Sequence, residues 1–165
     1  MAASSTVKTA IDGEIKLIDG TTPTANEFAI SFEDGDFSFS DDKTERIVMR
    51  DRGAIVGLRK GDDSVGTFSF SCYMRDFTDT GELTICDVID KTAAASSWIS
   101  TGGTGFEQYL LNVQIKVEGG DHGDTGDHIL TLSKCFLSWN VSESKDGNKI
   151  DVTGECYGTR VRTEA

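Results

Sequence analysis

The stretch Thr67–Tyr73, with the sequence TFSFSCY, alternates aromatic and small polar side chains. The same pattern occurs some thirty residues earlier, at 36–42, as DFSFSDD. A period of two places the phenylalanines of each stretch on one face and the serines on the other, which is typical of a β-strand with one buried face. Both stretches therefore predict strands of an amphipathic sheet, and the charged tract between them needs its own explanation.

The length and composition of the chain predict one domain, residues 1–165, that folds around its own core. The length is enough to bury a sizeable core, and the 37% apolar content argues against disorder. The formal net charge of −12 disfavours binding to nucleic acid or to anionic membranes. No apolar run reaches membrane-spanning length, and the first residues lack the pattern of a secretion signal. We therefore expect synthesis in a cytosol and no membrane insertion.

Two hairpins are predicted from turn residues flanked by alternating strands. In the first, Asp34-Gly35 would be the turn, which places Ile30 opposite Phe39. In the second, Asp146-Gly147 would be the turn, which places a large indole opposite a glycine, Trp139 opposite Gly154. This second register leaves Cys135 only diagonal to Cys156, beyond the usual span of a disulfide, so no bond between them within one chain is expected.

The stretch 84–98, TICDVIDKTAAASSW, predicts a helix. Thr84 can cap the helix, Asp87 follows three residues later, and the apolar residues after Thr84 share a face. Further strands are predicted at 14–18, 65–74 and 109–118. The fold class is therefore mainly β: a β-barrel or sandwich with a single flanking α-helix and a long inter-strand loop. Residues 1–13 would form an N-terminal arm and 159–165 a C-terminal tail.

The tract at 41–64 mixes charged residues of both signs with glycines and exposed-looking aliphatic residues. Its composition favours a hairpin extension or a long loop. The aliphatic residues need a covering surface that the parent core is too far away to supply, so a neighbouring subunit is the natural supplier. Four carboxylates and the lack of interleaved aromatic residues argue against a nucleic-acid patch.

Catalytic motifs are missing from the sequence, which predicts no enzyme activity and no cofactor. The arrangement DHGDTGDH at 121–128 brings His122 and His128 among three aspartates. Imidazole and carboxylate groups could gather a divalent cation, but the spacing fits neither a zinc motif nor an EF-hand. Asp and Gly are also what an exposed turn uses, and we favour that interpretation.

Four cysteines are widely separated and form no C-x-x-C pair: Cys72, Cys86, Cys135 and Cys156. The simplest interpretation is that they are small buried hydrophobic residues of a cytosolic protein. A second interpretation is that cysteines near an interface oxidise after release from the host and form disulfides between subunits.

The order of elements resembles the tail tube (major tail) proteins of long-tailed bacteriophages and the related inner-tube proteins of type VI secretion systems. Five features occur in sequence: the FSFS strand, the loop RIVMRDRGAIVGLRKGDDS, the strand VGTFSFSCYM, the helix and the hairpin that ends in CYG. The resemblance covers about Ile15 to Gly158. It implies a structural virion protein, assembled in the bacterial host cytoplasm into the phage tail.

The family plan implies six subunits to a ring, with rings stacked around a tape-measure protein beside other tail proteins. Double-stranded DNA later passes through the tube without sequence-specific contacts. Short hydroxyl groups would suit such a bore, because exposed basic residues would hold the phosphates back. Lumen-facing residues would be Thr67, Ser69 and Ser71. The ring-stacking interface would include Arg46, Arg50, Asp51, Arg52, Ile55, Val56, Arg59, Lys60, Asp62 and Asp63.

Two other classes of function compete with this one. The first is a β-sandwich module of a phage or bacterium that binds a receptor or a carbohydrate, which the abundant aromatic residues favour. The second is a metal-dependent hydrolase that uses His122 and His128. Rings or filaments in the electron microscope would select the tube, and a monomer with affinity for glycans would select the binding module.

Overall fold

The structure, a computed structural model, describes residues 13–31, 37–41, 44–74, 77, 81–117, 126–144 and 147–164. The fold is mainly β, as predicted, with one α-helix in the described part of the chain. In chain order the elements are β1 (Glu14–Ile18), β2 (Glu27–Ser31), β3 (Ser38–Ser40), β4 (Thr44–Asp51), β5 (Ala54–Asp63), β6 (Gly66–Tyr73), α1 (Ile85–Asp90), a 3₁₀ turn η2 (Ala93–Ala95), β7 (Leu111–Val117), β8 (His128–Ser144), β9 (Gly147–Cys156) and β10 (Arg160–Glu164).

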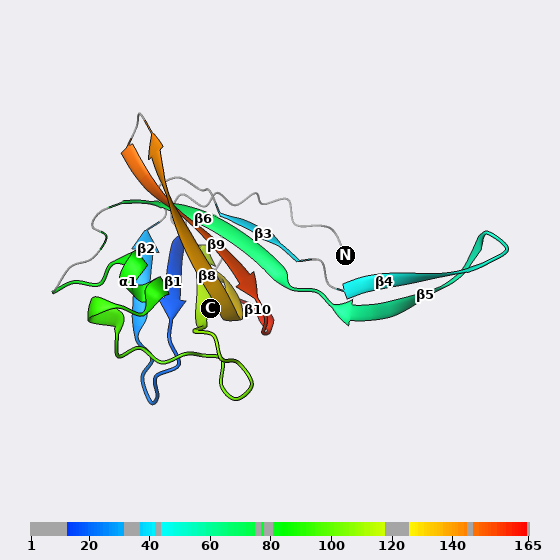
Figure 1. The fold of residues 1–165 in the computed structure, drawn as a ribbon, viewed down its shortest axis with the longest axis horizontal. Coiled ribbons are helices and arrows are strands. Elements are labelled where there is room, and N and C mark those ends of the chain that lie inside the picture. Colours follow the sequence, from blue (N-terminus) through cyan, green and yellow to red (C-terminus); the bar gives the residue numbers. More distant parts are fainter. Residues whose placement is uncertain are drawn as a thin grey trace.

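Eight strands form one antiparallel sheet, and two form a separate ribbon. The sheet has the order β2-β1-β7-β8-β9-β6-β3, and β10 pairs with the first half of β8. We call this sheet with α1 the body. Among the described residues, β4 and β5 pair only with each other, and they extend away from the body, as Figure 1 shows. We call residues 44–63 the ribbon.

The core lies on one face of the sheet, where the predicted alternation is confirmed. Phe68 and Phe70 of β6 are buried, whereas Thr67, which points to the other face, is exposed. Leu111, Val113 and Ile115 alternate in the same way along β7. Helix α1 covers this face with Ile85, Val88 and Ile89, all of which belong to the same buried cluster.

The predicted helix at 84–98 is correct at its start and wrong at its end. Thr84 caps α1, because its hydroxyl accepts a hydrogen bond from the backbone N–H of Asp87. The α-helix stops at Asp90, since Lys91 has the left-handed backbone conformation (φ 57°). The Thr92 hydroxyl then donates to the Asp87 carboxylate at 3.0 Å. The chain continues into the short turn η2 instead of a longer helix.

The two predicted hairpins have different outcomes. β2 pairs with β1 and β3 pairs with β6, and the predicted pair of Ile30 with Phe39 is not among the pairings of the described residues. The predicted turn at 34–35 lies outside those residues. The hairpin of β8 and β9 exists, but its ladder ends with Ser144 opposite Gly147, so every partner differs by two residues from the predicted register.

This shift changes the neighbours of Gly154 and of the cysteines. Gly154 lies opposite Leu137 on one side and Phe68 on the other, and not opposite Trp139. A Cβ at position 154 would lie 2.2 Å from the ring of Phe68, so glycine is required there. Cys135 and Cys156, predicted as diagonal neighbours, lie directly opposite each other.

Two further predictions concern the segments outside the main strands. The tract at 41–64, predicted as a hairpin extension or long loop, is a hairpin of two long strands. The predicted C-terminal tail at 159–165 is wrong for most of its length, because β10 forms a regular ladder with β8. The strand was not readable from RVRTE, because this sequence shows no clear alternation of apolar and polar residues and four of its five residues are exposed. The predicted N-terminal arm lies almost wholly outside the described residues.

Candidate functional site

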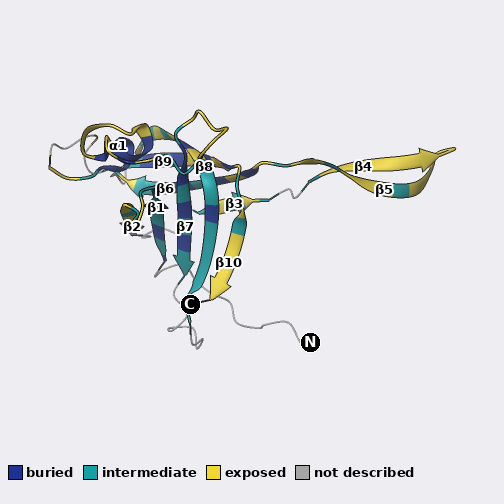
Figure 2. Ribbon diagram, turned by 90° about the horizontal axis from the view of Figure 1, so that it is seen from below, coloured by how far each residue is buried: buried dark blue, intermediate teal, exposed yellow. Residues whose placement is uncertain are grey.

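The ribbon is a solvent-exposed hairpin with a tight tip. Arg52 and Gly53 connect the strands, and both have positive φ, 46° and 87°. Two such residues make the type I′ turn whose twist matches that of antiparallel strands. Figure 2 shows the contrast with the body: ribbon residues are mostly exposed, whereas body strands carry buried stripes.

Large apolar side chains of the ribbon are uncovered on both of its faces. Val48 lies opposite Leu58, and the next residue back, Ile47, lies opposite Arg59 and therefore points to the other face. Six such side chains are 43–64% exposed: Ile47, Val48, Met49, Ile55, Val56 and Leu58. A two-stranded ribbon has no second layer of its own, and no other described part of this chain covers either of its faces.

The charges of the ribbon are distributed unevenly along its length. Residues 46–60 contain five basic residues and one acidic residue, Asp51, although the whole chain carries −12. Nearer the body, Lys60 pairs with Asp63 at 2.8 Å, and this hydrogen bond and charge lower the pKa of Asp63. All ten residues predicted for the interface lie on this hairpin. Eight of them lie within residues 46–60, on the side of Gly61 that is nearer the tip.

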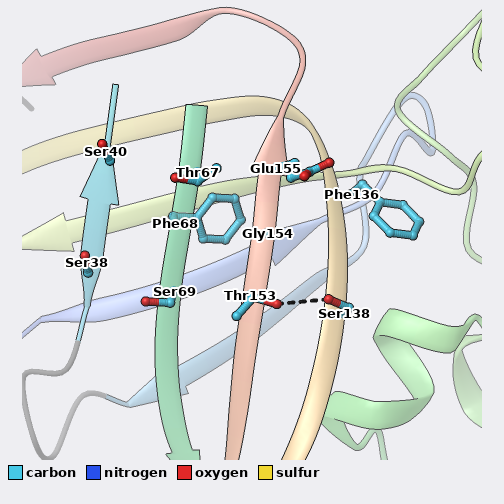
Figure 3. Close-up of a pocket in the computed structure, with 10 residues that line it drawn as sticks. All are labelled: Ser38, Ser40, Thr67, Phe68, Ser69, Phe136, Ser138, Thr153, Gly154 and Glu155. Atoms are coloured by element: carbon cyan, nitrogen blue, oxygen red, sulfur yellow. Dashed lines mark hydrogen bonds between the residues drawn. The ribbon is translucent and has the colours of Figure 1, made fainter. Parts of the chain in front are cut away.

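The face of the sheet opposite the core carries rows of hydroxyl groups. Cross-strand partners place Ser38, Ser69, Thr153 and Ser138 in one row across β3, β6, β9 and β8. Ser138 and Thr153 are hydrogen-bonded at 2.9 Å, as Figure 3 shows. Cross-strand partners share a face of a sheet, so the row is continuous over four strands.

A second row runs beside the first and completes a shallow groove of about 420 Å³. It consists of Ser40, Thr67, Glu155 and Phe136. We call the two rows the hydroxyl face, and Glu155 is the charged side chain among the residues that line this groove.

The structure thus brings two of the three predicted lumen residues, Thr67 and Ser69, into one surface with side chains of three other strands. Ser71 lies one row further along β6, opposite Asp151. Ser138 and Thr153 were not predicted as site residues. Their alternation with buried Leu137 and Val152 was the available signal, but the strand order that brings them beside β6 cannot be read from local sequence.

One arginine holds the root of the ribbon. The Arg160 guanidinium of β10 forms an ion pair with Asp41, just before β4, and donates to the Ser64 carbonyl oxygen at 3.0 Å, just after β5. Both side chains of the ion pair are about four-fifths buried, at 20% and 18% exposure. The two ends of the ribbon are therefore tied to the same residue of the body.

The cysteines are free thiols and lie in or beside the core. Cys86, Cys135 and Cys156 are buried, and Cys72 is half-buried. Burial raises the pKa of Cys72 to about 11 and also raises the pKa of Cys86, with the nearby Asp90 adding to the effect. The four cysteines therefore agree with the interpretation of small buried residues, while disulfides between subunits stay a prediction.

The metal hypothesis falls mostly on residues that the structure does not describe, including His122. Of the predicted group, His128 and Asp127 are described, and the Asp127 carboxylate pairs with Lys116 at 2.7 Å. Within the described ranges, no group of three or more His, Cys, Asp or Glu residues could hold a metal ion. In the same ranges, no helix has the length and apolarity needed to cross a membrane.

The sequence matches no protein-family model, and no curated protein matches it either. Solved structures do match. A chain of the PVC sheath–tube complex, from an extracellular contractile injection system in its extended state, has a TM-score of 0.62 and 12% identity, covering 96% of this chain and 93% of that one.

Two further chains come from a terminator and a cap. One belongs to the PVC sheath/tube terminator in the extended state, with a TM-score of 0.62, 14% identity and coverage of 98% and 99%. The other belongs to the tube-terminating cap of the anti-feeding prophage, with a TM-score of 0.61, 12% identity and coverage of 100% and 96%. The chain therefore has a fold that occurs in the tube, terminator and cap assemblies of phage-tail-like particles.

Proposed function

We propose that this protein is a structural subunit of a phage-type tail tube, which assembles into stacked rings of six and forms a conduit for DNA. The observation that carries the proposal is the ribbon, whose apolar side chains are exposed on both faces. The fold supports it, since it occurs in chains of sheath–tube and tube-terminator complexes. The protein acts by assembly and needs no catalytic residue or cofactor.

The ribbon docks on a second copy of this chain. Six exposed apolar side chains in one hairpin are a large uncovered surface for a monomeric protein. The basic stretch at 46–60 faces outward from a chain whose remaining residues are strongly acidic. The surface of another subunit is therefore complementary to the ribbon in charge, and self-association satisfies both features at once.

The hydroxyl face lines the bore of the tube. Its Ser and Thr groups are short and neutral, and Glu155 would repel phosphates. Such a wall offers no basic residue on which a DNA backbone, with one charge about every 1.7 Å, would be held. The tape-measure protein would occupy the same bore during assembly, which takes place in the bacterial host cytoplasm before the tail joins the virion.

The decisive experiment is negative-stain electron microscopy of the purified protein and of a matched pair of variants. Ile55→Ser removes an apolar side chain that is 64% exposed on the ribbon, and Ile99→Ser removes one that is 51% exposed on the body. We expect wild type and Ile99→Ser to form rings and tubes, and Ile55→Ser to stop at rings or monomers. Tubes of normal length from Ile55→Ser would refute the role of the ribbon.

The charge argument has its own test. The double variant Arg50→Glu and Arg59→Glu reverses two of the five basic groups without changing the apolar surface. We expect a folded protein that fails to extend into tubes. A wild-type protein that stays monomeric at high concentration and binds glycans would instead support the carbohydrate-binding alternative.

A further inference from the structure

Two cysteines meet inside the body where β8 and β9 begin their ladder. Cys135 and Cys156 are cross-strand partners, and both are fully buried. The Tyr157 N–H donates to the Lys134 carbonyl oxygen at 3.1 Å, which marks the hydrogen-bonded pair next to them. Cys135 and Cys156 are therefore a non-hydrogen-bonded pair, whose Cα atoms lie about 4.5 Å apart, within the span of roughly 4.4–6.8 Å that disulfides require.

The two thiols have different tendencies to ionise. The hydrogen bond from Cys135 lowers the pKa of Cys156, and the Gly158 backbone and the Arg160 guanidinium add to this effect. The same hydrogen bond, together with burial, raises the pKa of Cys135. Ionisation is thus favoured at Cys156 relative to Cys135, and as thiols both donate to backbone carbonyl oxygens, Cys135 to that of Leu132 and Cys156 to that of Ser133.

The position of Arg160 beside Cys156 depends on a glycine. Gly66 of β6 is a cross-strand partner of Cys156, and a Cβ at position 66 would lie 3.0 Å from Nε of Arg160. The missing side chain therefore leaves room for the guanidinium over this part of the sheet. Nε itself is buried and has no hydrogen-bond partner in the described structure, so this cation is not fully occupied by Asp41 and Ser64.

The other two cysteines provide a contrast within the same chain. Cys72 and Cys86 also influence each other, but burial raises the pKa of both, and neither gains a stabilised thiolate. The pair at 135 and 156 is the one whose geometry and electrostatics both favour oxidation.

We propose that Cys135 and Cys156 form an oxidisable dithiol, which hydrogen peroxide converts into a disulfide within one subunit. The Cys156 thiolate attacks one oxygen of the peroxide, the O–O bond breaks, and hydroxide leaves, which gives a sulfenic acid. Cys135 then attacks the Cys156 sulfur, the S–O bond breaks, and water leaves with the proton of Cys135. Two thiols and one peroxide become one disulfide and two waters. Peroxide is close to water in size, so it suits a buried pair better than a bulky disulfide reagent does.

The bond would fasten β8 to β9 beside Arg160, at the root of the ribbon, and does not depend on tube assembly. A cross-link between positions 135 and 156 restricts the unfolded chain. We expect oxidation to raise the Tm by roughly 5–10 °C.

The test starts from the reduced full-length protein. After treatment with hydrogen peroxide, the protein is denatured, its free thiols are alkylated, and the peptides are mapped by mass spectrometry. We expect a peptide that joins Cys135 to Cys156, with Cys72 and Cys86 alkylated. Four alkylated thiols, or a cross-link between chains as the main product, would overturn the proposal. This measurement needs no variant, so a variant that fails to fold does not weaken it.

Four variants assign the roles. Cys135→Ser should leave Cys156 able to react but without a resolving thiol, so dimedone, added together with denaturant after the peroxide, should trap its sulfenic acid; no adduct would contradict the order of attack. Cys72→Ser, the matched control, should oxidise like wild type. Arg160→Gln should slow disulfide formation at least fivefold, and Arg160→Lys should restore part of the rate. An unchanged rate in Arg160→Gln would remove Arg160 from its positioning role.

Discussion

The body and the ribbon are both antiparallel β-structures, but they obtain their stability differently. Phe68 of β6 is 4% exposed, and Ile55 of β5 is 64% exposed. In β6, Phe68 and Phe70 belong to the same buried cluster as residues of α1, whereas no described residue of β5 is buried. Hydrophobic residues in a strand therefore do not by themselves indicate a core. In the ribbon they form the exposed surface that we propose is covered by another subunit.

The comparison predicts that equal truncations have unequal effects on the two regions. Leu132 is fully buried and Leu58 is 64% exposed. Leu132→Ala should lower the free energy of unfolding by about 4 kcal/mol, because it leaves a cavity in the core. Leu58→Ala should change it by less than about 0.5 kcal/mol. Urea unfolding of the purified variants measures both, and a comparable loss in Leu58→Ala would mean that the ribbon packs within its own chain.

Adding a side chain at a glycine should also destabilise the body more than the ribbon. A Cβ at Gly154 would lie 2.2 Å from the Phe68 ring, whereas a Cβ at Gly57 of the ribbon would lie 3.7 Å from Sδ of Met49. Gly154→Val should therefore cost about 3 kcal/mol through overpacking. Gly57→Val should cost almost nothing or stabilise the strand slightly. Thermal unfolding followed by circular dichroism checks both, and equal Tm values would contradict the packing described for Gly154.

Acid should lower the free energy of unfolding of the body, because it protonates the carboxylate of Asp19. Burial would raise the pKa of Asp19, but hydrogen bonds from Thr21, Asn26 and the Ile99 backbone outweigh it and lower the pKa to about 2. Because the folded pKa is below the unfolded value of 3.8, this carboxylate stabilises the fold above about pH 4. The contribution, about 2 kcal/mol, should disappear as the pH falls toward 2.

The matched control for this prediction lies in the ribbon. Asp19→Asn should flatten the dependence of stability on pH between about 4 and 2, whereas Asp63→Asn should leave it unchanged, because Asp63 is solvent-exposed and its partner Lys60 is too. Urea midpoints at several pH values measure the effect. A curve for Asp19→Asn that follows the wild type would show that other groups cause the acid sensitivity.

Alternation in the sequence predicted which residues face the core, but not how the strands are ordered. Phe68 and Phe70 could be placed from their own strand, since a period of two is a local property. The register of β8 with β9 was wrong by two residues because Asp146-Gly147 is a good turn sequence, yet Gly147 already belongs to β9 and pairs with Ser144. A shift of two keeps every side chain on its predicted face, so the hydrophobic pattern could not reveal the error.

The wrong register also limited which parts of the candidate sites could be predicted from the sequence. The wrong register separated Cys135 from Cys156, and the structure brings them together. The ribbon residues could be predicted as an interface because charge and exposed apolar groups are local features. The hydroxyl face could be predicted only in part, since Ser38 and Ser138 join Ser69 through pairings between distant strands.

The attachment of the ribbon has a mechanical consequence. Both of its ends meet Arg160, so the hairpin is a lever with its fulcrum on the last strand of the chain. Ten residues of β5 extend to about 33 Å. A tilt of about 4° at the fulcrum would move the tip by about 2 Å over that length, enough to bring it into or out of contact with a neighbour. In the proposed tube, a small rotation of one subunit would in this way be transmitted to the next.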